Sequence, residues 1–285
     1  MKIFEGNDRL AYRDPTCYYH GGFFHLFFTV SEKEGGYMYN RIGYARSADL
    51  KTWSSIRLLT ERDLTKNFSS PGNVLARGDG FWICFCSYPM PQPFRERHWA
   101  TGDARLYTMF TRDFEHFEEP RLLNPKSHLP IEQTGRMIDP YLVEKDGQVY
   151  VFYDGGGISY ATSKDGQSWA FGGRVPGGER CENPCILPWQ DRYLLLASPD
   201  SGITFFESKD LLHWTQTRRE PLRRPEWDWA DGRLTAAFAL ELPDGLEHRY
   251  AVFFHGSRDV FPETHGNATL ALVFTDDFET YWDEI

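Results

Sequence analysis

Five runs of aromatic and aliphatic residues recur along the chain, and most begin behind a turn of Gly, Asp or charged residues. Each run is about as long as one strand and is almost continuously apolar, which is typical of buried strands rather than of amphipathic helices. A turn followed by such a run predicts a β-hairpin. The five runs are GGFFHLFFT, DGFWICFCSY, DGQVYVFYD, DRYLLLAS and HRYAVFFHG.

A second pattern, Ser/Thr-x-Asp-x-x-x-aromatic, follows each run, and the interval from Asp to the aromatic residue is constant. The Asp and Ser/Thr side chains can hydrogen-bond to nearby backbone amides and hold a tight turn, after which the aromatic residue packs inward. Five chance matches are the alternative, but the constant interval and the preceding hairpin argue against chance. The copies are Ser47/Asp49/Trp53, Thr111/Asp113/Phe117, Ser163/Asp165/Trp169, Ser208/Asp210/Trp214 and Thr275/Asp277/Tyr281.

A further strand is predicted ahead of each hairpin. In four cases an X-Pro pair marks it, and we expect the Pro at the beginning of the strand, where no ladder donor is needed. One unit is therefore a leading strand, a hairpin, an Asp turn and a fourth strand. The leading strands are marked by Asp14-Pro15, Ser70-Pro71, Asp139-Pro140, Asn183-Pro184 and, without Pro, Arg233.

Five such units in 285 residues leave about 57 residues each, which suits four-stranded blades. We predict an all-β, five-bladed β-propeller with antiparallel blades around a central channel. No linker or break in composition divides it, so residues 1–285 are expected to form one domain. Residues 2–5 are candidates to complete the last blade and close the ring. The blades are expected at approximately 12–60, 68–123, 137–175, 182–218 and 233–285.

The composition agrees with this fold and argues against two classes of partner, nucleic acids and membranes. Aromatic residues make up 16% of the chain, and 25 Gly and 17 Pro suit short strands and tight turns. The net charge of −10 argues against a nucleic-acid partner, because a phosphate backbone attracts a basic surface. The first residues lack the apolar core of a signal peptide, and no apolar run approaches the roughly 20 residues of a membrane helix. We therefore expect a cytoplasmic protein without a membrane partner.

Five cysteines, an odd number, are expected to be reduced thiols in that compartment. Cys84 and Cys86 fall on one face of a strand and are expected to be small core residues. A zinc site that joins them to Cys181 and Cys185 is the alternative.

Three of the leading segments carry a carboxylate: Asp14, Asp139 and Glu182. The first strand of every blade lines the channel of a propeller, so these acids are expected to converge on one face. Acids at the rim of a narrow channel lose solvent and repel one another, which drives their pKa values apart. A protonated and an ionised carboxyl together are the groups that cleave a glycosidic bond. The alternative is that each acid only caps a turn before Pro.

The order Asp14-Pro, Asp139-Pro and Glu182-x-Pro on a five-bladed repeat resembles the furanosidase superfamily, which includes glycoside hydrolase families 43, 62, 32, 68 and 117. The resemblance covers nearly the whole chain. It implies that Asp14 is the general base and that Glu182 is the general acid. It also implies that Asp139 modulates the pKa of the acid and stabilises the transition state. Glu179 is the alternative acid.

Two departures from family 32 favour the family-43 type. Tyr-Arg-Asp-Pro-Thr-Cys stands in place of the Trp-x-Asn-Asp-Pro-Asn-Gly that is typical of family 32, and no C-terminal β-sandwich is expected. The resemblance then implies inversion, with Asp14 activating water and Glu182 protonating the departing oxygen across roughly 6.5–9.5 Å. A cytoplasmic location favours an exo-acting enzyme on short oligosaccharides, such as an arabinofuranoside, a xyloside or a related glycoside.

Further side chains are predicted to contact the sugar. Aromatic rings can stack on sugar faces, although packing between blades is an equally common use of Trp. Arg233 is expected to bridge a carboxylate or a sugar hydroxyl. His255 resembles a histidine that holds a central ion in some relatives. It is therefore either a ligand of a structural calcium or other ion in the channel, or a core residue; no cofactor is expected to be required. The predicted substrate contacts are Ser70, Tyr88, Trp99, Trp227, Trp229 and Arg233.

Four other functions stay open. A retaining, family-32-like fructosidase would use the same acids, and a sialidase would need an arginine trio for its substrate's carboxylate. A sugar phosphorylase would need a basic phosphate pocket, to which Arg223 and Arg224, or Arg95 and Arg97, would contribute. A propeller that binds carbohydrate or a protein without catalysis is the alternative that is not an enzyme.

Overall fold

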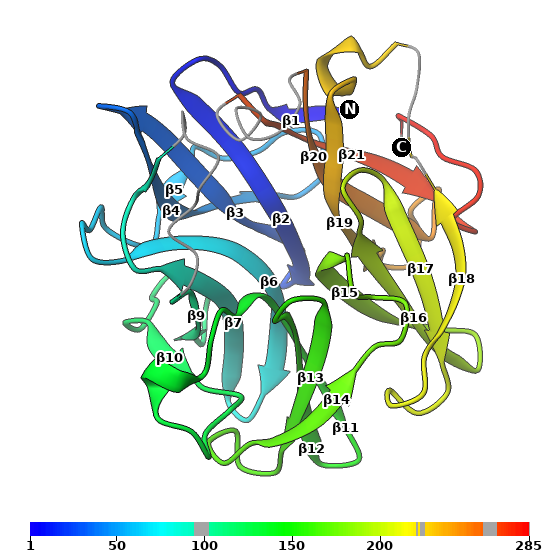
Figure 1. Cartoon of the computed structure of the whole chain (residues 1–285). Helices are drawn as coiled ribbons and strands as arrows, with labels where there is room; N and C mark the ends of the chain where they lie inside the picture. The colour runs from blue at the N-terminus through cyan, green and yellow to red at the C-terminus, as the bar shows by residue number, and fades with distance from the viewer. Residues whose placement is uncertain (94–102, 221, 223–225, 259–266, 285) are drawn as a thin grey trace.

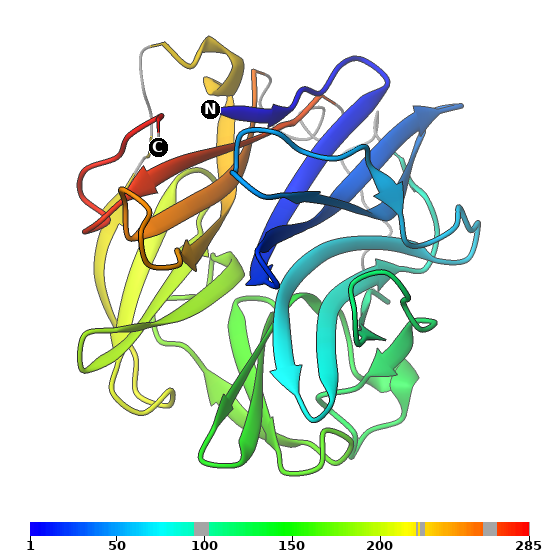
Figure 2. The same cartoon turned by 180° about the vertical axis from the view of Figure 1, so that it is seen from behind.

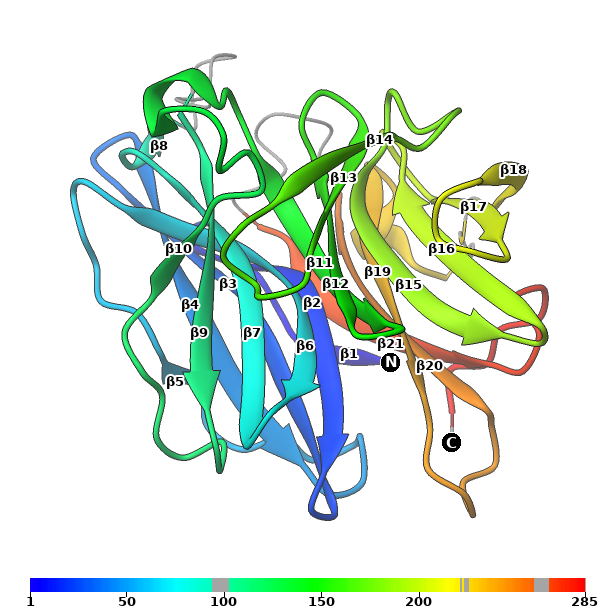
Figure 3. The same cartoon turned by 90° about the horizontal axis from the view of Figure 1, so that it is seen from below.

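The computed structural model forms five antiparallel sheets arranged around a central axis (Figure 1). It describes residues 1–93, 103–220, 222, 226–258 and 267–284. The first strands of neighbouring blades contact each other in a closed ring. A view at right angles shows the strands running between two faces on which the turns lie (Figure 3). The predicted all-β, five-bladed propeller is confirmed.

Each sheet is a meander whose first strand lies at the axis, and the strand order within the sheets follows the predicted unit. In the first blade a short additional strand, β8, pairs with β4. The first blade contains β2 (Leu10–His20), β3 (Phe23–Glu34), β4 (Tyr37–Ser47), β5 (Arg57–Leu58) and β8 (Gln92–Pro93). The second contains β6 (Asn67–Arg77), β7 (Gly80–Tyr88), β9 (Arg105–Thr111) and β10 (Arg121–Leu123).

The remaining blades repeat this arrangement. The third contains β11 (Ile138–Lys145), β12 (Gln148–Asp154), β13 (Ile158–Ser163) and β14 (Ala170–Arg174). The fourth contains β15 (Glu182–Trp189), β16 (Arg192–Ser198), β17 (Ile203–Ser208) and β18 (Thr215–Glu220). The fifth contains β19 (Arg233–Glu241), β20 (Tyr250–Ser257), β21 (Thr269–Thr275) and β1 (Lys2–Phe4). Between blades lie two 3₁₀ helices, η1 (Ile131–Gln133) and η2 (Asp228–Ala230).

The N-terminal strand completes the fifth blade and so closes the ring. β1 pairs antiparallel with β21, and both chain ends lie at this blade (Figure 2). The amino group of Met1 donates a hydrogen bond to the Leu272 carbonyl at 2.8 Å. The fifth sheet therefore contains strands from both ends of the chain, as predicted for residues 2–5.

The five Asp turns form as predicted. In each, one Asp oxygen accepts hydrogen bonds from the backbone amides two and three residues later, and the Asp49 carboxylate does so at 2.9 and 2.7 Å. The residue after the Asp has a positive φ in every copy. These acids form turns at the surface, where four are exposed and Asp210 is half-buried. The equivalent bonds are made by Asp113, Asp165, Asp210 and Asp277.

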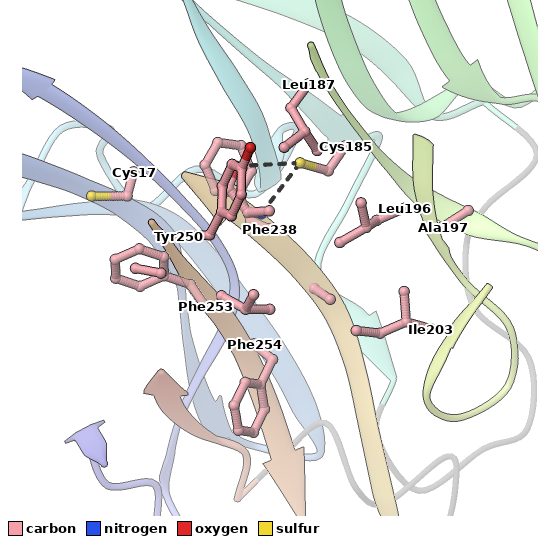
Figure 4. Packing of buried hydrophobic residues seen from close by; sticks show 14 of the residues in the cluster. Cys17, Cys185, Leu187, Leu196, Ala197, Ile203, Phe238, Tyr250, Phe253 and Phe254 are labelled. Atoms are coloured by element: carbon pink, nitrogen blue, oxygen red, sulfur yellow. Dashed lines mark hydrogen bonds between the residues drawn. The ribbon is translucent and has the colours of Figure 1, made fainter. Parts of the chain in front are cut away.

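Packed apolar side chains fill the spaces between blades. Figure 4 shows the contact of blades 4 and 5, where Cys185, Leu187 and Leu196 of blade 4 lie beside Phe238 of blade 5. All five cysteines are buried and free, and Cys84 and Cys86 are core residues of β7. Within the described residues no helix is long and apolar enough to cross a membrane.

Candidate active site

A bulge interrupts the first strand of every blade at one equivalent position, where the register with the second strand slips. One residue of each bulge has a positive φ of 51–55°, a strained conformation that is common at functional sites. In four blades the next residue is Pro, which a bulge tolerates. The prolines therefore lie inside the strands, and the prediction that they begin the strands was wrong. The strained residues are Asp14, Ser70, Asp139, Asn183 and Ala236.

Asp14 lies in the bulge of β2 with a buried side chain. Its Oδ2 accepts hydrogen bonds from the Thr29 hydroxyl at 2.9 Å and from the Ser70 hydroxyl at 3.3 Å. Burial disfavours the charged form, but the Arg13 guanidinium and the Thr29 hydroxyl help to outweigh burial and lower the pKa of Asp14. Asp14 is therefore ionised at neutral pH.

His255 on β20 supports the backbone of the same bulge. The Asp14 amide donates a hydrogen bond to His255 Nδ1 at 3.1 Å. Burial lowers the pKa of His255 to about 3, so the ring is neutral and its proton is on Nε2. The 3.7 Å separation of His255 Nδ1 and Asp14 Oδ1 is therefore not an ion pair. The part of the chain that the structure describes contains no group of three or more His, Cys, Asp and Glu residues that could hold a metal.

Asp139 occupies the same bulge position on β11 and is buried. Burial, reinforced by the charges of Glu182 and Asp14, raises the pKa of Asp139 well above its usual value. The Asn183 amide donates a hydrogen bond to Asp139 Oδ2 at 3.3 Å and so links the bulges of blades 3 and 4. The structure thus brings Asp14, Asp139 and Glu182 into one electrostatic environment.

Glu182 begins β15, one residue before the bulge, and its side chain is 31% exposed. Arg233 Nη2 donates a hydrogen bond to Glu182 Oε1 at 2.7 Å, while Arg233 Nε donates to the Asp200 carbonyl at 3.2 Å. Loss of solvent raises the pKa of Glu182, and the Arg233 charge opposes that rise without cancelling it. Glu182 is therefore a carboxyl held by a cation but still shifted towards its protonated form.

A cavity of about 610 Å³ lies beside Glu182, between elements of blades 3, 4 and 5, and is of a size that holds a small ligand. Arg136, Arg180 and Arg233 line it, and each lies three residues before the strained residue of its blade. Arg136 Nη1 donates a hydrogen bond to Asp154 Oδ2 at 2.7 Å. Two of the three arginines are thus bound to carboxylates of the cavity wall.

Three of the four predicted aromatic contacts lie away from this cavity. Tyr88 is buried at the end of β7, where burial and then the Cys86 and Asp139 charges raise its pKa well above the usual value. The rings of Trp227 and Trp229 pack against an aromatic ring of β20. Neither Tyr88 nor Trp229 lines the cavity. Trp99 lies outside the described residues.

Sequence reasoning missed Thr29, Arg136, Asp154 and Arg180. The arginines had a signal, since each lies three residues before the residue that precedes Pro in blades 3 and 4. Asp154 ends the aromatic run of the third blade. Thr29 had no signal, because one hydroxyl in FFHLFFT looks like any small residue of a buried strand.

The comparisons with known proteins address the fold. No family model matches the chain, and no curated protein matches it. An α-L-arabinofuranosidase from Lactobacillus brevis superimposes with a TM-score of 0.65 at 13% identity, over 98% of this chain and 95% of that one. An exo-β-1,3-galactanase from Clostridium thermocellum gives 0.67 at 15% identity, over 95% and 62%. The family-32 β-fructofuranosidase of Bombyx mori gives 0.62 at 15% identity, over 95% and 61%.

The structural neighbours are five-bladed glycoside hydrolases of families 43 and 32. At such identities the similarity shows the fold alone. This chain spans nearly the full length of the arabinofuranosidase, but less than two thirds of the galactanase and the fructofuranosidase.

Proposed function

We propose that this protein is a glycosidase of the family-43 type that cleaves an O-glycosyl bond with inversion. One observation carries the proposal: two carboxyl groups of one site are shifted in opposite directions, with the pKa of Asp14 lowered and that of Glu182 raised. Divergent shifts of this kind distinguish a base from an acid in glycoside hydrolysis. The fold that this chain shares with glycosidases supports the same reaction.

In this mechanism Asp14 accepts a proton from the attacking water, and Glu182 gives its proton to the departing oxygen. Arg233 stabilises the Glu182 carboxylate that forms, so its 2.7 Å contact strengthens as the reaction proceeds. Asp139, whose pKa is raised, keeps its proton beside two other acids and limits the negative charge at the site. No cofactor takes part in these steps.

The substrate is proposed to be a short oligosaccharide cleaved from one end, such as an arabinofuranoside or a xyloside. The cavity beside Glu182 supports this class, since its charged lining can hydrogen-bond to several hydroxyl groups. The arabinofuranosidase with the same fold supports a furanoside in particular.

The test is hydrolysis of 4-nitrophenyl arabinofuranosides, xylosides, fructosides and galactosides by wild type, Asp14→Asn and Glu182→Gln. We expect turnover of at least one glycoside by wild type and a loss of at least about 100-fold in Asp14→Asn. Glu179→Gln is the matched control, because Glu179 lines the same cavity and is exposed. An NMR time course of the first anomer released tests inversion. Turnover that survives Asp14→Asn unchanged overturns the assignment of the base.

Phosphorolysis is a second candidate, favoured by one observation. Arg180 lines the cavity and has no hydrogen-bond or ion-pair partner among the described residues, so it can bind an anion such as phosphate. Inorganic phosphate added to the same assays decides between the two reactions. A phosphorylase forms a sugar phosphate in proportion to the phosphate supplied, whereas a hydrolase forms only free sugar.

A further inference from the structure

The carboxylate of Asp14 is held by a chain of hydrogen bonds that begins in the next blade. The Ser70 amide of β6 donates to Thr29 Oγ1 at 2.8 Å. That amide uses the hydroxyl as an acceptor, so the hydroxyl hydrogen is available to Asp14 Oδ2 at 2.9 Å. Thr29 is fully buried, so no water competes for either bond.

Other blades hold the remaining parts of Asp14. The Ser70 hydroxyl donates to the same Oδ2, and the neutral ring of His255 accepts the Asp14 amide. Blades 1, 2 and 5 therefore each contribute one group to this residue. Two donors converge on Oδ2, and Oδ1 is the oxygen without a hydroxyl donor.

We propose that Thr29 is a positioning residue for the base: its hydroxyl, oriented by the Ser70 amide, holds Asp14 Oδ2 and leaves Oδ1 to face the attacking water. This inference rests on the proposed hydrolysis for its catalytic meaning. The positioning itself is a structural property that can be measured without a substrate. A hydrogen bond to a charged group is worth enough to change a rate about 10- to 100-fold.

Burial of a threonine in the core does not by itself explain the hydrogen bond from Thr29 to Asp14. Thr16 on β2 and Thr235 on β19 are also buried threonines on the inner hairpins, and their hydroxyls have no hydrogen-bond partner in the described chain. A buried threonine in this propeller therefore needs no partner. The bond from Thr29 to Asp14 is a specific arrangement, and Thr16 supplies a matched control.

The test compares Thr29→Val, Thr29→Ser and Thr16→Val. Valine has the shape of threonine without the hydroxyl, and serine keeps the hydroxyl without the methyl group. On the aryl glycoside that wild type cleaves, we expect kcat of Thr29→Val to fall about 10- to 100-fold with KM changed less than about threefold. Thr29→Ser is expected to recover most of kcat, and Thr16→Val to match wild type.

Crystal structures of the same variants give the second measurement. We expect the Asp14 carboxylate to rotate or to occupy more than one orientation in Thr29→Val, and to stay in place in Thr29→Ser and Thr16→Val. Thermal unfolding of each variant identifies any general loss of stability, because valine also leaves the Ser70 amide without its acceptor.

The two proposals fail in different ways. An Asp14 carboxylate that keeps its orientation in Thr29→Val overturns the positioning role, as does an equal loss of kcat in Thr16→Val. If wild type cleaves none of the glycosides, the proposed function fails, and the crystal structures alone decide whether Thr29 positions Asp14.

Discussion

Glu182→Gln changes the proposed acid with little change to the fold. The glutamine keeps a side-chain oxygen that can accept the hydrogen bond from Arg233 Nη2, and Arg233 also keeps its bond to the Asp200 carbonyl. Because folding raises the pKa of Glu182, its charged form adds no stability at neutral pH, and a neutral glutamine is not expected to destabilise the fold. A large loss of activity would therefore report chemistry rather than unfolding.

The loss is expected to depend on the leaving group. General acid catalysis contributes about 10²- to 10⁴-fold when the departing oxygen needs a proton. For a disaccharide we expect kcat of Glu182→Gln to fall by that factor. For the 4-nitrophenyl glycoside of the same sugar, whose leaving group is stable as an anion, we expect a much smaller loss.

The pH profiles provide an independent check. Wild type loses activity on the disaccharide as the pH rises through the raised pKa of Glu182, because the acid is then deprotonated. It also loses activity as the pH falls through the lowered pKa of Asp14, because the base is then protonated. Glu182→Gln should lack the alkaline limb and keep the acid limb. Equal losses on both substrates, or an alkaline limb that persists in the variant, would refute this reasoning.

Three further predictions concern stability. Folding raises the pKa of Asp139, so the stability that this residue contributes is complete below about pH 3.9 and is lost as the pH rises. Asp139→Asn should therefore raise Tm relative to wild type at pH 8 but not at pH 3. Equal shifts of Tm at the two pH values would contradict this. A Cβ on Gly72 would clash with the Pro140 carbonyl oxygen of blade 3, so Gly72→Ala should cost about 3 kcal/mol or more in urea unfolding. Gly35→Ala, with nothing within 4 Å, should cost only about 1 kcal/mol for its positive φ, and similar losses would argue against the clash. The Phe4 ring lies 5.2 and 5.6 Å from two rings of blade 1, so Phe4→Ala should cost about 1–3 kcal/mol in the same assay, and no loss would contradict closure of the ring by β1.

Local patterns were enough to predict the elements that depend on near neighbours in the chain. The Asp turns use only amides two and three residues away, so the spacing of Asp49 and its four counterparts predicted them correctly. The position of Pro15 within β2 was not predictable in this way. A bulge is defined by the register against β3, and no pattern within a single strand states that register.

In the candidate site, too, features set by the local repeat were predictable and contacts between blades were not. Asp14, Asp139 and Glu182 were predicted because each lies one or two residues before a Pro in a repeated unit, and repetition around an axis brings corresponding segments together. The contact of Thr29 with Ser70 joins residues 41 positions apart, and that of Arg233 with Glu182 joins residues 51 positions apart. Such contacts depend on how neighbouring blades pack, which residue type alone does not specify.

By itself, the sequence determined the number of blades, the turns between their strands and the presence of an acid one or two residues before Pro in three blades, because each of these recurs in the repeated unit. Only the tertiary structure decided which acid is ionised and which keeps its proton. Asp14 lies between Arg13, Thr29 and Ser70, whereas Asp139 is buried beside two other carboxyl groups. The same Asp-Pro pair thus has opposite pKa shifts in two blades, since the charge state depends on burial and on the side chains that the neighbouring blades supply.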